Sequence, residues 1–145
     1  MINDDFSELI KLLNLTNIQI IESNEKVLQS MSFNGGEEVQ INMEQGFPKD
    51  NNPQINETQL SFYPKYIFTF SIGGKIYFKT EYILIVQFKT ENIQRFSELY
   101  ANEEVREIFL KKQLHRTLWT ILRGTVLDAF NRHSLKPIPL PWIIS

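Results

Sequence analysis

Hydrophobic and polar residues alternate along the middle of the chain, and this pattern predicts two adjacent strands. Apolar side chains occupy every second position over 66–72 and again, except at Thr80, over 76–88, and Gly73-Gly74 separates the two runs. Such alternation is typical of a strand with one buried face. A glycine pair between two alternating runs predicts a β-hairpin. We therefore expect a hairpin here with one face against the core.

Two more strands are expected upstream of this hairpin. The segment 39–44 alternates cleanly, whereas 16–33 is rich in isoleucine and valine but alternates poorly. The poor alternation predicts a long, bent strand with a bulge at 23–25. An Asn-Gly-Gly sequence at 34–36 predicts the turn between these strands. Together the four runs predict a four-stranded antiparallel sheet over 16–90.

A helical period marks both ends of the chain. Near the N-terminus, apolar residues at i, i+3, i+4 and i+7 predict a short helix within 1–15, docked on its own domain or on a neighbouring subunit. A long helix is expected over 102–134, with Asn102 as its N-cap. Three prolines beyond this helix predict an extended tail over 135–145.

The long helix carries more apolar residues than one sheet needs. Between 118 and 130 they cover an arc of roughly 240°, whereas a surface helix needs a stripe of about 100°. We expect one side to cover the sheet and another to meet a second subunit. The interface residues predicted on this helix are Leu118, Trp119, Leu122, Val126, Leu127 and Phe130. Gly124 costs about 1 kcal/mol relative to alanine, so a close contact with the sheet or a partner helix is expected there.

Composition places these elements in a single α+β domain over 1–145. The chain has 145 residues, of which 42% are hydrophobic, and this length and content suit one domain with its own core. A net charge of -2 gives no general affinity for polyanions, so no nucleic-acid partner is expected. The absence of cysteine, the acidic N-terminus and the lack of a long apolar run favour a cytoplasmic protein without membrane insertion.

The residues offer little for catalysis. His115 and His133 are the only histidines, and eighteen helical residues would place them roughly 27 Å apart, so they cannot share a site. Motifs for zinc hydrolysis, phosphate binding and dinucleotide binding do not occur. His115 is expected to be a partly exposed helical residue. We expect a protein that is not an enzyme and uses no cofactor and no metal.

Aromatic residues are concentrated around the predicted hairpin. Nine of the eighteen aromatic residues lie over 62–88, so aromatic side chains are expected on more than one surface. Aromatic grooves bind unfolded segments by burying their side chains, and open strand edges bind them by backbone pairing. Two interpretations follow: these rings line a groove for apolar or extended ligands, or they form the core.

The C-terminal stretch resembles the SecB family of export chaperones. Arg123 and Arg132 have the nine-residue spacing of two arginines that the family carries on its long helix and at its end. The segment 137–143 matches the family's apolar, proline-rich ending in character, and His133 replaces a glycine. The order of four strands and the glycine turn of the last hairpin also look similar, so the resemblance spans about residues 16–144.

This resemblance implies a four-stranded antiparallel sheet covered by a long helix, in subunits that assemble as dimers of dimers through that helix. It also implies a homo-oligomer that holds unfolded polypeptide clients or preproteins in apolar grooves and delivers them to a translocation ATPase. In well-known members the delivery step uses an acidic sheet surface and a C-terminal tail. Other proteins that resemble this fold protect an antitoxin in toxin–antitoxin systems. The N-terminal helix is extra relative to the best-known members.

Three functional hypotheses are therefore open. The first is a SecB-like, ATP-independent holdase. Its proposed client contacts are Phe47, Phe62, Tyr66, Phe68, Phe70 and Trp142. The second hypothesis keeps the fold but assigns the binding of one dedicated partner. The third is a small-ligand-binding or isomerase-like α+β domain with an enclosed pocket lined by Tyr82 or Asp128.

Overall fold

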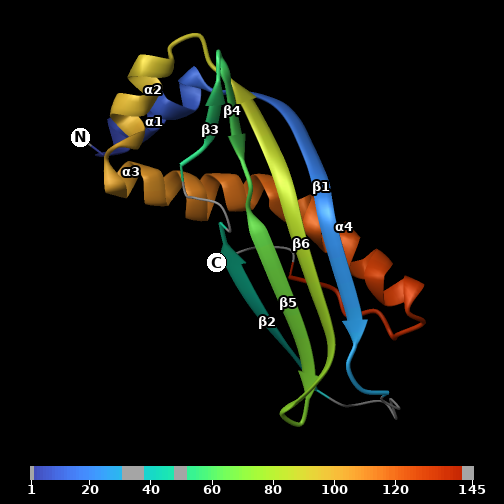
Figure 1. Ribbon diagram of the computed structural model, residues 1–145. Helices are drawn as coiled ribbons and strands as arrows, with labels where there is room; N and C mark the ends of the chain where they lie inside the picture. Colours follow the sequence, from blue (N-terminus) through green and yellow to red (C-terminus); the bar gives the residue numbers. More distant parts are fainter. Residues whose placement is uncertain (1, 31–37, 48–51, 142–145) are drawn as a thin grey trace.

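The computed structural model describes residues 2–30, 38–47 and 52–141, and it has two layers. A long antiparallel sheet forms one layer, and the long helix crosses one of its faces (Figure 1). The α+β fold with a long C-terminal helix and an additional N-terminal helix is confirmed. The turn expected at 34–36 and the tail residue Trp142 lie outside the described residues.

Within the described residues the chain begins with a helix, continues with six strands and ends with a run of helices. The helices are α1 (Ile2–Leu12), α2 (Ile93–Tyr100), α3 (Glu103–Ile108), the π-helical turn η1 (Phe109–Leu114) and α4 (His115–Arg132). The strands are β1 (Asn14–Val27), β2 (Val39–Gly46), β3 (Gln54–Asn56), β4 (Gln59–Phe62), β5 (Lys65–Ile72) and β6 (Lys75–Lys89). The helices α3, η1 and α4 follow one another directly and form the long helix.

The strand β6 lies at the centre of the sheet. β1 pairs with it on one side along nearly its whole length, from Asn14 opposite Lys89 to Val27 opposite Phe78. β4 and β5 pair with successive parts of its other side, and β3 and β2 pair with them in turn. The expected four strands become six because Pro64 separates β4 from β5 and because β3 is added beyond β4.

The hairpin of β5 and β6 is confirmed. Gly73 and Gly74 form its turn with φ angles of +59° and +80°. Positive φ at both central residues is the type I′ geometry, whose twist matches that of the flanking strands and which glycine adopts without strain. The turn therefore explains why this pair is glycine.

The edge strand β1 bends at two places, but neither is the predicted one. Its pairing with β6 is irregular at Thr16 and again at Ile21, whereas 23–25 pairs without interruption. The prediction of a bulge at 23–25 is therefore wrong. Regular pairing there keeps Glu25 on the helix-covered face, where the Tyr82 hydroxyl donates a hydrogen bond to its carboxylate.

The long helix begins at the expected cap and contains an unexpected π-helical turn. The Asn102 side chain accepts hydrogen bonds from the backbone N–H groups of Glu104 and Val105, at 2.9 and 3.3 Å. In η1 the wider winding changes which backbone groups are paired. The Gln45 side chain from β2 donates to the Leu110 carbonyl at 3.4 Å, so β2 is joined to this turn.

The alternation along β5 and β6 determines which side chains form the core. The rings of Phe70 and Phe130 meet edge-on with centroids 4.7 Å apart, which joins the hairpin to α4. The aromatic core contains Phe62, Tyr66, Phe68, Phe70, Phe78, Tyr82, Phe96, Phe109 and Phe130. A Cβ added at Gly124 would meet nothing within 4 Å, so the expected close contact with the sheet is wrong. A contact with a partner helix at this position stays a prediction.

The tail after α4 runs back along that helix. At its start, the Leu135 N–H donates to the Phe130 carbonyl at 2.9 Å. At its end, Trp119 Nε1 donates to the Pro141 carbonyl at 2.8 Å. Eleven helical residues separate these two partners, which is about 16 Å, and six extended steps cover about 19 Å. The described part of the tail is therefore extended and antiparallel to α4.

Candidate functional site

The aromatic residues proposed for client contact lie mostly beneath the long helix. Four of them are at most 1% exposed, namely Phe62, Tyr66, Phe68 and Phe70. Phe47 is partly buried against the same core, and Trp142 lies outside the described residues. Client contact by these residues stays a prediction. In this conformation the four buried side chains offer no surface to a client.

The helix residues proposed for a subunit interface are also largely enclosed within the chain. Five of them are at most 7% exposed, namely Leu118, Trp119, Leu122, Val126 and Phe130. Leu127 is partly exposed. Part of the large apolar arc is covered by the tail, because Leu140 is only 2% exposed and belongs to the same core. The subunit interface stays a prediction, and the exposed side of α4 is the side still available for it.

The imidazole of His115 lies inside the protein. It is 5% exposed, so the expectation of a partly exposed residue is wrong. Its ring contacts the rings of Tyr66 and Trp119, with centroids 5.4 and 5.2 Å away. Its Nδ1 lies 2.9 Å from the Tyr66 hydroxyl, which accepts a hydrogen bond from Gln45. Burial lowers the pKa of His115 and raises the pKa of Tyr66, so a neutral polar chain joins the long helix to β5 and β2.

A charged cluster fixes the other end of the long helix. The Glu25 carboxylate binds the Tyr82 hydroxyl at 2.9 Å, the Arg132 guanidinium, and His133 Nε2 at 3.3 Å. Burial raises the pKa of Glu25, but the hydrogen bonds from Arg132, Tyr82 and His133 together outweigh burial and hold that pKa below its ordinary value. Arg132 thus has a structural role at a helix C-terminus, where the helix dipole favours positive charge.

An aromatic groove of about 240 Å³ lies between α2 and β3. We call it the α2–β3 groove. It is lined by Asn52, Pro53, Ile55, Phe96, Ser97, Tyr100, Ala101 and Arg106. The rings of Phe96 and Tyr100 stack with centroids 5.1 Å apart, and they are only 1% and 4% exposed. Ile55 on β3 is 49% exposed. None of these residues was singled out from the sequence as a site, although Phe96 and Tyr100 are one helical turn apart.

Two features beside these rings suit a polypeptide ligand. The Arg106 guanidinium lies 5.9 Å from the centroid of the Tyr100 ring and donates to the Tyr100 carbonyl, so a cation borders the apolar wall. Among the described residues, β3 pairs only with β4 and ends the sheet. Its outer edge therefore presents backbone groups with which an extended segment can pair.

The N-terminal helix docks on its own chain. Leu9 is fully buried in the core, and Glu8 pairs with the Arg95 guanidinium of α2 at 2.7 Å. A second hollow, of about 200 Å³, lies between α1, the sheet and the long helix. Its lining is Ile10, Leu13, Leu15, Phe88, Phe109, Gln113, Leu114 and Thr117.

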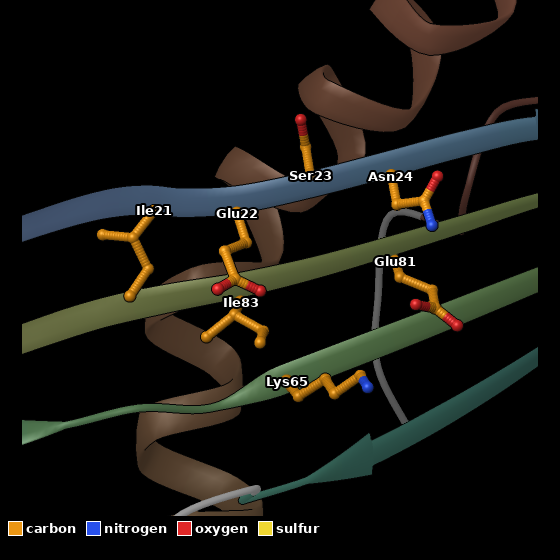
Figure 2. Close-up of a pocket in the computed structure, with 7 residues that line it drawn as sticks. All are labelled: Ile21, Glu22, Ser23, Asn24, Lys65, Glu81 and Ile83. Atoms are coloured by element: carbon orange, nitrogen blue, oxygen red, sulfur yellow. The ribbon is translucent and has the colours of Figure 1, made fainter.

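The sheet face opposite the long helix is open and carries both signs of charge. A hollow of about 510 Å³ lies across β1, β6 and β5 on this face, and Figure 2 shows the side chains that line it. Its lining is Ile21, Glu22, Ser23, Asn24, Lys65, Glu81 and Ile83. Glu81 also pairs with Lys79 at 3.3 Å. This face is therefore not uniformly acidic.

The long edge strand β1 exposes apolar side chains. Leu15, Ile20, Ile21 and Val27 are between 37% and 47% exposed. Within the described residues β1 pairs only with β6, so its other edge is open over fourteen residues. A long open edge with apolar residues is a surface that proteins usually cover.

The described residues include no cluster of three or more His, Asp or Glu side chains arranged to hold a metal ion. No helix in that part of the chain is long and apolar enough to cross a membrane.

Comparison with solved structures identifies the fold. The chain aligns with the Mycobacterium tuberculosis Rv1957 SecB-like chaperone, solved in complex with a ChAD peptide from the Rv1956 HigA1 antitoxin. The TM-score is 0.73 and the identity 12%, over 98% of this chain and 97% of that chain. A protein of unknown function from Streptococcus agalactiae aligns with a TM-score of 0.41 at 12% identity, over 90% and 97% of the two chains.

Sequence comparison adds nothing to this similarity, since no family model and no curated protein matches the chain. An identity of 12% supports a statement about architecture and not about activity. The chain has a SecB-like fold.

Proposed function

We propose that this protein is a SecB-like, ATP-independent chaperone that binds unfolded polypeptide segments, and that the α2–β3 groove is a client-binding site. The observation that carries the proposal is the combination at this groove of an exposed isoleucine and an open strand edge, backed by two stacked rings that are 1% and 4% exposed. An extended segment gains backbone pairing from such an edge and side-chain burial against Ile55.

A dedicated partner fits the surface better than delivery to a translocation ATPase. Export delivery in the SecB family uses an acidic sheet surface, whereas the open face of this sheet mixes Glu22 and Glu81 with Lys65 and Lys79. Opposite charges at close range cancel each other's field and give little long-range attraction for a basic partner. The solved SecB-like chaperone with an antitoxin peptide also supports a defined polypeptide partner. We therefore favour one dedicated client, with a protein such as an antitoxin as the model.

A homo-oligomer belongs to this proposal. The open β1 edge with its exposed Leu15, Ile20 and Val27 supports assembly there. β1 and β3 lie on opposite sides of β6, so assembly through β1 leaves the α2–β3 groove accessible. Light scattering should report at least twice the mass of 17.1 kDa. A monomer mass under dilute native conditions would contradict this part of the proposal.

The small-ligand hypothesis gains no support from its two residues. Tyr82 is buried, and its hydroxyl is bound to Glu25. Asp128 is exposed on α4. The two side chains that were to line an enclosed pocket therefore lie in different environments.

The test is a binding and aggregation assay with two matched substitutions. Purified protein should delay the aggregation of a chemically unfolded protein at equimolar amounts and without nucleotide. Ile55→Asp should weaken client binding about tenfold, because it places a charge on the apolar wall of the groove. Ile76→Asp is the control. Ile76 is similarly exposed, at 42%, and lies beside the hairpin turn at the other end of the sheet (Figure 1).

Two results would contradict the proposal. No delay of aggregation with several unfolded proteins, together with no binding of a defined partner such as an antitoxin, would exclude a chaperone of either kind. Equal client affinity of the Ile55→Asp and Ile76→Asp variants would exclude the α2–β3 groove as the binding site.

A further inference from the structure

The tail lies on α4 as proline-rich peptides lie on their receptors. Trp119 Nε1 donates to the Pro141 carbonyl at 2.8 Å, and Arg123 Nε donates to the Leu140 carbonyl at 3.2 Å. Trp119 and Arg123 are one helical turn apart, so they meet two successive carbonyls of a chain that runs along the helix. We call Trp119, Arg123 and the buried position filled by Leu140 the tail seat.

The sequence of the tail matches this mode of contact. Prolines occupy every second position from Pro137 to Pro141, and a proline has no backbone N–H to donate. The polar backbone groups of such a segment are therefore mainly carbonyls, and these are the groups that the tail seat contacts. Extended proline-rich peptides bind aromatic-lined sites because their conformation is already fixed and little entropy is lost.

Only the aliphatic residues of the tail enter the protein. Leu140 is 2% exposed, and Leu135 and Ile138 are partly buried against the core, whereas Lys136 and Pro139 are exposed. The tail seat thus holds an aliphatic residue followed by proline, and it contacts the carbonyls of both. This pattern is short enough to occur in many unfolded polypeptides.

We propose that the tail seat is a binding site for an extended, proline-containing segment of a client polypeptide, and that the chain's own tail occupies it in the free protein. The inference rests on the proposed function, because it adds a second contact and a client class to the same chaperone activity. The attached tail competes at an effective concentration on the order of millimolar. Client affinity is reduced by the fraction of molecules whose seat is occupied.

The first test loosens the tail in the full-length chain. Leu140→Ser removes the buried side chain that anchors the tail. Lys136→Ser is the control, because it introduces serine at an exposed position of the tail. The probe is a labelled synthetic peptide of residues 135–145, and binding is measured by fluorescence anisotropy. The Leu140→Ser chain should bind this peptide at least about tenfold more tightly than the wild type and the control. Equal binding to all three chains would overturn the proposal.

A further substitution separates recognition from simple loosening. In the Leu140→Ser background, Trp119→Phe keeps an aromatic ring but removes the N–H that meets the Pro141 carbonyl. The peptide should then bind about fivefold more weakly. An unchanged affinity would show that the tail seat does not recognise the carbonyl.

The second test uses the unmodified protein and so does not depend on a variant folding. A labelled, reduced and carboxymethylated protein that contains proline serves as the client. Excess tail peptide should displace this client, and the same peptide with Leu140→Ser should not. If the client binds but the peptide does not displace it, the inference is wrong and the proposed function stands. If no client binds, the proposed function fails and the tail seat is only an internal contact.

Discussion

The hairpin core and the α2–β3 groove are both built around buried aromatic rings, but they differ in the length and exposure of the strands beside those rings. In the core, Phe70 lies between the sheet and the long helix, in contact with Phe78 and Phe130. In the groove, the buried rings of Phe96 and Tyr100 stack on each other beside a strand of only three residues, whose Ile55 is 49% exposed. The ring-rich strands thus form the interior, and the ligand-sized hollow appears where the elements are short.

This difference teaches which sequence feature indicates a binding surface. An alternating run of aromatic residues in a long strand indicates burial, because its inner face is covered along the whole strand. A short edge strand leaves its backbone groups and side chains such as Ile55 incompletely covered, even where the rings beside it are buried. The following changes test this distinction, from the largest expected loss of stability to the smallest.

Phe70→Ala should be the most damaging change. Phe70 is fully buried, and its loss leaves a cavity between β5, β6 and α4. We expect a loss of about 3–5 kcal/mol in the free energy of unfolding, measured by urea denaturation. A loss below about 1 kcal/mol would show that this ring is not enclosed in solution.

Tyr66→Phe should cost less, because it removes a hydroxyl and leaves the ring. The Tyr66 hydroxyl is hydrogen-bonded to both His115 and Gln45, and both would lose this partner inside the protein. We expect a loss of about 1–3 kcal/mol in the same assay. Tyr63→Phe is the control, since the Tyr63 hydroxyl contacts Gln54 at the surface, and it should cost less than about 0.5 kcal/mol. Equal effects of the two changes would contradict the buried polar chain.

The stability of the core should fall on mild acidification. Burial lowers the pKa of His115, so below its unfolded value of about 6.5 the unfolded chain binds a proton that the folded chain does not. The stability that neutral His115 contributes is therefore fully present above that pH, and it is lost as the pH falls towards the lowered pKa. Each unit by which folding lowers this pKa corresponds to about 1.4 kcal/mol in the free energy of unfolding.

The measurement is the free energy of unfolding at pH 8 and at pH 5.5. Replacing His115 by Gln should remove most of the difference between these two values. A pH dependence that survives in the His115→Gln variant would place its origin elsewhere.

Ile55→Asp should have the smallest effect on stability, because its side chain is already half exposed at the groove. We expect a change within about 0.5 kcal/mol. The same change should weaken client binding about tenfold, for the reason given above. A large loss of stability would show that Ile55 belongs to the core and not to a binding surface.

Local patterns predicted much of the fold. The alternation of β5 and β6, the Gly73-Gly74 turn and the Asn102 cap were all visible in the sequence because each depends on neighbouring residues. The burial of His115 could also have been predicted, since this residue lies at helical spacing from Leu118 and Leu122, which are both buried.

The candidate sites depend on contacts between distant parts of the chain, and so they could not be predicted in the same way. The α2–β3 groove brings Ile55 to residues some forty positions later. The return of the tail onto α4 is decided by Trp119 and Arg123, whose donors have no distinct signal in the sequence. The π-helical turn η1 likewise follows from packing and not from a local pattern.

The most direct test of polypeptide binding by this protein is a hydrogen-exchange footprint. Exchange is measured by mass spectrometry with and without a saturating unfolded client. The account predicts slower exchange at β3 and α2, where a client pairs with the strand edge and lies in the α2–β3 groove. Unchanged exchange at β3 and α2 in the presence of a bound client would contradict it.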